Sequence, residues 1–455
     1  MSEYLSKFQE SLLDKDTFSC TWELVPGRGS FEAAQEVVVA SAEAAAKGGR
    51  VHALTITDNP GGNPAISAEM LGAEILSMGV EPLVHFTCKD KNRNQLEGLL
   101  YGMERAKVRN LLIMTGDYTY SGYKGRSKPV FDIDPSMLCN MIADMNKGLE
   151  VPTFKGTATL QPTHFFAGAA VSPFKALESE QMGQYYKLKK KIEAGAQFIV
   201  TQLGYDVRKI QEALLMVKHL GFAHVPVIGN IYLLPLGAAK LMNRNGLPGC
   251  VVTNDMVATL QKEADSAADK GKGARMDRAA KMYAMMKGMG FAGVHIGGHG
   301  MKYEDFEYVL DKGEELAPNW QEYVKEFEFG QPNGWYYFEK DAKTGLNTDQ
   351  PVDRSLDRPA GTVGYKAFKV LHHAMFEKKG FLFKPMQSLA RAVDGSSMEH
   401  LFTRVEHFMK VMTNECMHCG DCGLFDLAYV CPTSQCSKGQ RNGPCGGSFE
   451  GWCEV

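Results

Sequence analysis

The chain has 455 residues, of which 44% are hydrophobic and 23% are charged, and its formal net charge is −3 at pH 7. This composition is typical of a soluble globular protein, and the length exceeds one ordinary core. The lack of a basic excess argues against a nucleic-acid partner, and no run of eighteen apolar residues exists to span a membrane. The first fifteen residues are unlike a secretory signal, so we expect a cytoplasmic protein with reduced thiols.

Between residues 18 and 300, short strand-forming runs alternate with longer segments of helical period. The strands are predicted at 18–25, 51–58, 82–88, 110–116, 165–172, 198–203, 225–232 and 293–297. The helices predicted between them include 30–47, 66–78, 94–106, 180–194, 207–219 and 276–289. Eight such units match the size of an α/β fold of the (β/α)8 TIM-barrel type. An open doubly wound sheet would need a GxGxxG fingerprint after a strand, which is lacking.

Polar residues gather where these predicted strands end. Glu23 follows the first strand, Asp117 follows the fourth, and Gln202 follows the sixth. Thr55 and His85 lie on the second and third strands. Each such residue can instead cap a helix or bond to a loop, but several on one rim predict a lined cavity at the end of the barrel where TIM-barrel active sites lie. Glu23 is the hardest to explain as a cap, because a carboxylate within an apolar run is costly to bury.

The alternation ends near residue 300. Two further helices are predicted at 364–377 and 385–393, in a segment that either wraps over the barrel or docks the tail. An amphipathic helix at 398–412 leads into the tail. The predicted domains are a barrel (1–300), an extension (301–395) and a cysteine-rich metal-binding domain (396–455).

Seven of the eleven cysteines lie in this tail, at Cys416, Cys419, Cys422, Cys431, Cys436, Cys445 and Cys453. Thiolates at i, i+3 and i+6, with a later one before a proline, favour an iron–sulfur cluster such as [4Fe-4S]. A structural zinc site uses the same ligands, and disulfides or reduced thiols are a third interpretation. A cluster would carry electrons, whereas zinc would only brace the tail.

The strand ends resemble those of the methylenetetrahydrofolate reductase family. The motifs that carry the resemblance are Thr21-Trp22-Glu23, Leu54-Thr55, Val84-His85-Phe86-Thr87-Cys88, Thr115-Gly116-Asp117, the block from Lys189 to Ala196, and Thr201-Gln202. The likeness spans residues 18–300, and the tail around 441–447 is similar to the cysteine-rich domain found with acetogen-type reductases. The resemblance implies a flavin-bearing barrel that passes a hydride to 5,10-methylenetetrahydrofolate, giving 5-methyltetrahydrofolate in one-carbon metabolism.

The resemblance also implies residue roles. Glu23 would help to protonate the folate N10, and a raised pKa of its carboxyl group would let it hold that proton. Asp117 would pair with the pterin ring, and Gln202 would contact it. The positions that match flavin contacts are Thr55, His85, Asp117, Lys191 and Ala196, with Lys191 suited to the phosphate. FAD is favoured over FMN.

Three positions depart from the family pattern. Thr115 replaces an arginine, Val171 or Ser172 a tyrosine, and Lys175 a flavin-contacting histidine. One alternative is therefore a folate-binding methyltransferase that lacks flavin and has structural zinc in its tail. A second alternative is a non-catalytic electron-transfer subunit, against which the retained Glu23 and Asp117 argue. For the reductase we expect a tetrahydrofolate-type substrate, a ferredoxin or redox partner subunit as electron donor, and a homo- or hetero-oligomer.

Overall fold

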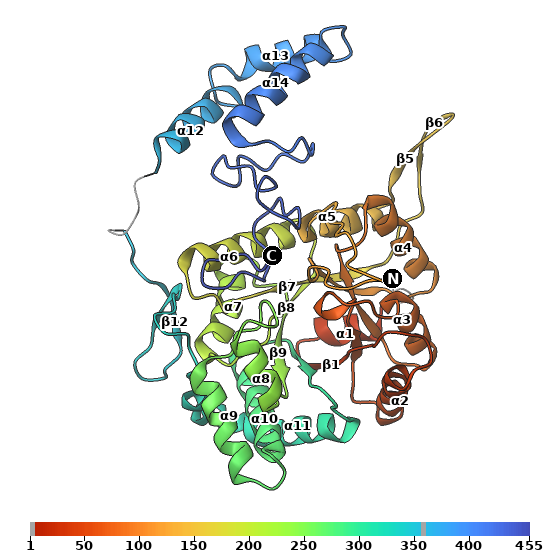
Figure 1. Cartoon of the computed structure of the whole chain (residues 1–455), viewed down its shortest axis with the longest axis vertical. Coiled ribbons are helices and arrows are strands. Elements are labelled where there is room, and N and C mark those ends of the chain that lie inside the picture. The colour runs from red at the N-terminus through yellow and green to blue at the C-terminus, as the bar shows by residue number, and fades with distance from the viewer. Residues whose placement is uncertain (1–4, 356–360) are drawn as a thin grey trace. The chain divides into compact units, whose positions relative to one another are not determined.

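The structure, a computed structural model, describes residues 5–355 and 361–455. Eight parallel strands close into a barrel in the order β1-β10-β9-β8-β7-β4-β3-β2. Their bounds are β1 (Ser19–Leu24), β2 (Ala53–Ile56), β3 (Pro82–Thr87), β4 (Asn110–Met114), β7 (Phe166–Val171), β8 (Phe198–Thr201), β9 (Val227–Tyr232) and β10 (Gly293–Gly297). Each strand lies within one of the eight predicted runs. The predicted TIM barrel is confirmed (Figure 1).

Helices cover the outside of the barrel. They are α2 (Ala33–Gly48), α3 (Ala68–Ser77), α4 (Arg93–Arg105), α5 (Pro135–Met145), α6 (Glu178–Glu193), α7 (Val207–His219), α8 (Leu236–Asn243), α9 (Asn254–Ser266), α10 (Lys272–Met289) and α11 (Tyr303–Leu316). The six predicted helices correspond to α2, α3, α4, α6, α7 and α10. The hairpin of β5 (Glu150–Thr153) and β6 (Gly156–Thr159) was not predicted and projects from the barrel in Figure 1.

The interior of the barrel is filled by a second apolar cluster, separate from the layer between strands and helices. It comprises Phe8, Leu12, Ala53, Leu83, Leu112, Phe166, Phe198, Val200 and Ile228. Phe8 comes from α1 (Lys7–Leu13), and its ring lies 6.0 Å from that of Phe166 and 5.6 Å from that of Phe198. Because Phe166 and Phe198 begin their strands, α1 closes the amino end of the barrel.

Residues beyond the predicted barrel boundary also pack onto it. These are the 3-10 segment η3 (Ala317–Phe327) and the two-stranded sheet of β11 (Phe338–Lys340) and β12 (Asn347–Pro351). Phe338 is fully buried, and Tyr336 donates a hydrogen bond of 2.6 Å to Asp206. The aromatic run at 335–338 therefore packs against the barrel.

The compact units of the structure are bounded differently from the predicted domains. Residues up to Val352 together with Pro444–Val455 form one unit, here called the barrel unit, and Asp353–Gly443 form the other, the tail unit. The last twelve residues thus pack with the barrel, although they are distant from it in sequence.

The described part of the tail unit contains three helices, α12 (Val363–Met375), α13 (Phe383–Val393) and α14 (Glu399–Asn414), close to the predicted bounds. The apolar face predicted for α14 is exposed, with Leu401 and Val405 at 54% and Phe408 at 62%. None of the described helices has the length and apolar character that a membrane crossing requires.

We expect Phe8→Ala to destabilise the barrel by about 3–5 kcal/mol, because it removes a buried ring from the interior and leaves a cavity. The denaturation midpoint in urea, followed by circular dichroism, measures the loss. The matched control is Phe31→Ala, since Phe31 is 89% exposed and its removal should change the midpoint little. Equal midpoints for Phe8→Ala and the wild type would show that α1 does not support the barrel.

Candidate functional site

Polar side chains replace the apolar filling at the carboxyl end of the barrel interior. Side chains two residues apart along a strand share a face, so Glu23 and Thr21 project to the same side of β1. Glu23, His85 and His295 come from β1, β3 and β10, and one potential ligand atom of each lies within 4.8 Å of the others. The predicted residues Glu23 and His85 are thus brought together. The third member, His295, was not predicted.

His295 links Glu23 to Thr21. Its Nε2 lies 3.3 Å from Glu23 Oε2, and its Nδ1 lies 3.0 Å from Thr21 Oγ1. The β1–β10 register pairs Thr21 with His295, which sets this geometry through the backbone. Both ring nitrogens of His295 are therefore engaged, and the imidazole is fixed in orientation.

The pKa values at this cluster depend on burial and on the neighbouring groups. Burial acts to raise the pKa of Glu23, but the hydrogen bond with His295 and the adjacent imidazoles outweigh it and hold the pKa below its ordinary value. The expectation of a raised pKa is therefore wrong for this structure. Burial lowers the pKa of His85 to about 4, so that imidazole is neutral at neutral pH.

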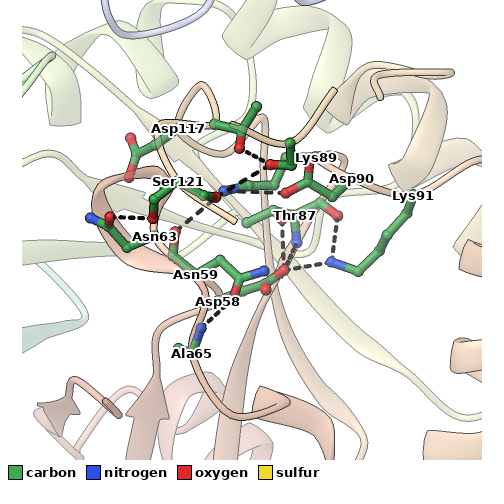
Figure 2. A network of polar contacts seen from close by, with 12 residues as sticks. Asp58, Asn59, Asn63, Ala65, Thr87, Lys89, Asp90, Lys91, Asp117 and Ser121 are labelled. Carbon is green, nitrogen blue, oxygen red and sulfur yellow. Dashed lines mark hydrogen bonds and ion pairs between the residues drawn. The ribbon is translucent and has the colours of Figure 1, made fainter. Parts of the chain in front are cut away.

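Loops that follow β2, β3 and β4 are joined by a polar network at the rim of the barrel (Figure 2). Asp58 Oδ2 accepts hydrogen bonds of 2.6 Å from Lys91 Nζ and from Thr87 Oγ1. Asp58 thus fixes the loop after β3. Asp58 is not the N-cap of a helix in the described residues, whereas Asp206 is the N-cap of α7 and accepts from the backbone N–H groups of Arg208 and Lys209.

Asp117 is held by the loop after β2. The backbone N–H of Gly61 donates a hydrogen bond of 2.7 Å to Asp117 Oδ2. The next residue, Gly62, has φ of +73°, and a Cβ there would lie 2.0 Å from the carbonyl oxygen of Tyr118. Only glycine permits this approach, which brings the β2 and β4 loops together and orients Asp117.

The positions matched to flavin contacts, other than Asp117, occupy two places. Thr55 and His85 are buried side chains on barrel strands. Lys191 lies at the end of α6, where its Nζ donates a hydrogen bond of 2.6 Å to the carbonyl of Ala170. Burial and the neighbouring Lys187 lower the pKa of Lys191 to about 8. Ala196 is buried in the layer between strands and helices, before the start of β8.

Lys175, which departs from the family pattern, holds the C-terminal segment. Its buried Nζ donates to the carbonyl oxygen of Gly446 at 2.6 Å and also to that of Ser448. Gln184 Nε2 donates to the carbonyl of Cys445 at 2.8 Å. The sequence offered one signal for this contact, which was the lysine at a position where the family has histidine.

The C-terminal segment passes beside a predicted substrate residue. A methyl group added at Gly249 would lie 3.0 Å from the carbonyl oxygen of Gly446 and 3.6 Å from Gln202 Nε2. Gln202 Oε1 itself accepts a hydrogen bond of 2.8 Å from the N–H of Leu203. The glycine-rich end of the chain therefore reaches the carboxyl end of β8.

The seven tail cysteines are divided between the two units. Cys416, Cys419, Cys422 and Cys431 line one cavity in the tail unit. Cys436 belongs to the same unit but does not line that cavity, whereas Cys445 and Cys453 lie in the barrel unit. Their sulfur atoms form no group of three within 4.8 Å among the described residues, so a shared metal would draw the four cavity thiols closer together.

Cys431 has a distinctive environment among these thiols. Burial acts to raise its pKa, but hydrogen bonds from the Thr433 side chain and from the backbone of Met417, Thr433 and Ser434 outweigh burial and lower it. Such bonds stabilise a thiolate, which is the form that ligates metals. Four thiols around one cavity fit both a [4Fe-4S] cluster and a zinc ion.

Comparisons with known proteins agree with the motifs. The sequence profile described as Methylenetetrahydrofolate reductase matches residues 7–305, and the one described as Methylene-tetrahydrofolate reductase C terminal matches residues 396–455. No curated protein sequence gives a match.

Two solved structures align with this chain at low similarity. An uncharacterized protein from Clostridium thermocellum that binds two copies of 5-methyl-5,6,7,8-tetrahydrofolic acid aligns with a TM-score of 0.47 at 12% identity, covering 69% of this chain and 100% of its own. Tryptophan synthase from M. tuberculosis aligns with a TM-score of 0.37 at 12% identity, covering 68% and 96%. Neither likeness is close enough to assign a function.

We expect Lys175→Met to loosen the C-terminal segment, because it removes two charge-assisted hydrogen bonds worth about 1.5–3 kcal/mol each. Hydrogen–deuterium exchange of the amides in 446–455 should accelerate by about tenfold or more. Lys155→Met is the matched control, since Lys155 is exposed in the β5–β6 hairpin. Unchanged protection in Lys175→Met would show that other contacts hold the segment.

Proposed function

We propose that this chain, which belongs to the methylenetetrahydrofolate reductase family, interconverts 5,10-methylenetetrahydrofolate and 5-methyltetrahydrofolate. The observation that carries this proposal is the Glu23–His295 pair at the carboxyl end of the barrel. A carboxyl group and an imidazole in contact can hold and deliver one proton, which the opening of the folate ring requires.

The lowered pKa leaves Glu23 ionised before the substrate binds. Thr21 holds Nδ1 of His295 and keeps Nε2 directed at the carboxylate. A folate that covers Glu23 removes water from the carboxylate, and this desolvation raises the pKa of Glu23. With its pKa raised, Glu23 takes up a proton and passes it to the leaving N10.

Asp117 and Gln202 are the residues that we propose to orient the pterin. Asp117 is fixed by the Gly61 N–H, so its carboxylate meets the substrate in a set direction. Gln202 stands where β8 ends, on the same rim. Hydrogen bonds from both residues would fix the position of the reacting carbon. Asp117 and Gln202 would thus orient the substrate without taking part in the bond changes.

We propose a flavin, with FAD favoured, held by Thr55, His85, Asp117, Lys191 and Ala196. His85 Nε2 is a buried nitrogen without a hydrogen-bond partner in the described part of the chain, and a polar cofactor edge would satisfy it. When bound, the flavin supplies the hydride that reduces the methylene carbon. A ferredoxin or a redox partner subunit is the proposed electron donor, acting through the tail metal if that metal is a cluster.

A second candidate function is supported by Lys175. Its side chain is occupied by the carbonyls of Gly446 and Ser448, at a position where the family pattern has a flavin-contacting histidine. A barrel that binds folate without flavin would handle methyltetrahydrofolate for methyl transfer. The flavin content of the purified protein, read from its absorption spectrum, separates the two candidates.

We expect Glu23→Gln to lower the turnover of 5,10-methylenetetrahydrofolate by about 10²–10⁴-fold, because the amide cannot deliver a proton. Flavin content and folate affinity should change much less. Steady-state assays under anaerobic conditions give kcat and KM separately. Glu36→Gln, on the exposed side of α2, is the control and should keep wild-type turnover. Wild-type activity in Glu23→Gln would contradict the proposed role.

We expect Cys419→Ser to lose the tail metal and Cys436→Ser to keep it, because only the first of these thiols lines the cavity. Iron, zinc and acid-labile sulfide are assayed on anaerobically purified protein. Iron with sulfide would identify a cluster, and zinc alone a structural site. Equal metal loss in both variants would contradict a ligand set of Cys416, Cys419, Cys422 and Cys431.

A further inference from the structure

Glu23, His85 and His295 offer one carboxylate oxygen and two imidazole nitrogens around one point inside the barrel. Their potential ligand atoms lie within 4.8 Å of one another, and no other group of three such donors this close occurs in residues 5–355 and 361–455. The three come from β1, β3 and β10, which the hydrogen-bonded barrel holds in fixed register. The donor positions are thus set by strands and not by mobile loops.

The hydrogen bonding of the two histidines leaves nitrogens that suit a metal ion. His85 is 6% exposed, and its Nε2 has no hydrogen-bond partner in the described structure. His295 is 3% exposed, and Thr21 Oγ1 at its Nδ1 orients its Nε2 toward Glu23. A partner on the second ring nitrogen is the usual arrangement of a metal-binding histidine.

The distances are close to those of a metal site. Nitrogen and oxygen ligands lie about 2.0–2.2 Å from zinc, which puts two ligands of one ion roughly 3.0–3.5 Å apart. The pair Glu23 Oε2 and His295 Nε2, at 3.3 Å, already meets this spacing. Because the other separations between these ligand atoms are at most 4.8 Å, binding one ion requires a side-chain adjustment of no more than about 1–2 Å.

We propose that Glu23, His85 and His295 bind a divalent late transition-metal ion such as Zn²⁺. Two imidazoles and a carboxylate suit Zn²⁺, Co²⁺, Ni²⁺ or Fe²⁺, whereas Mg²⁺ and Ca²⁺ prefer oxygen ligands alone. The ion takes the carboxylate and imidazoles that the proposed function uses for proton delivery and cofactor contact. If that function holds, Zn²⁺ and folate exclude each other, and the site makes the enzyme sensitive to this metal.

The first experiment needs no turnover. The full-length protein, purified without added metal, is titrated with Co²⁺ and its absorption spectrum is recorded. Cobalt in the barrel gives ligand-field bands without sulfur-to-cobalt charge transfer, and these bands should persist in Cys419→Ser. They should vanish in His85→Gln and stay in His224→Gln, a control at an exposed histidine. Cobalt bands that depend wholly on Cys419, or that survive in His85→Gln, overturn the proposal.

A milder variant provides a second test in case His85→Gln does not fold. Thr21→Val removes the hydrogen bond to His295 Nδ1 and should weaken Co²⁺ binding by about 10- to 100-fold without removing a ligand. An unchanged affinity for Co²⁺ in a folded Thr21→Val protein counts against the site. Inhibition of the wild type by Zn²⁺ that is competitive with folate supports the inference that the metal and folate exclude each other. If Zn²⁺ does not inhibit the enzyme although Co²⁺ still binds, the metal site stands and only the mutual exclusion of Zn²⁺ and folate is wrong.

Discussion

Closing eight parallel strands into a barrel gives every strand an inner face and an outer face, and this constraint sets the chemistry of the interior. The inner face is apolar at the amino end, where Phe8 of α1 packs on Phe166 and Phe198. It becomes polar at the carboxyl end, where Glu23 and His295 meet. Buried polar groups are costly unless they have partners, so these two stabilise each other inside the barrel.

The strands could be predicted from sequence because each one is a compact strand-forming run between clear helical segments. The polar residues at their ends could be predicted for the same reason. His295 was missed, since it lies within the run Gly293–Gly297 and its partner Glu23 is 272 residues away. Local patterns report which face a residue occupies but not which distant side chain it meets. The helix α1, with seven residues, is too short for periodicity to reveal.

The tail shows the difference between a pattern in sequence and a unit in space. The cysteine spacing predicted one domain over 396–455, and the matching sequence profile covers those residues. In the structure, contacts divide residues 396–455 between the two units. Pro444–Val455 belong to the barrel unit, where Lys175 binds Gly446 across 271 positions of sequence. Cysteine spacing alone could not separate Cys445 and Cys453 from the four thiols that share a cavity.

The return of Pro444–Val455 to the barrel means that the tail unit is an insertion tethered at both ends. Its effective concentration relative to the barrel is therefore set by two covalent connections and not by the amount of protein in the cell. A separate subunit carrying the same cysteines would dissociate on dilution, whereas this arrangement would not. Deleting everything after residue 352 would also remove the partner of a buried lysine, so the isolated barrel would differ from the barrel of the whole chain.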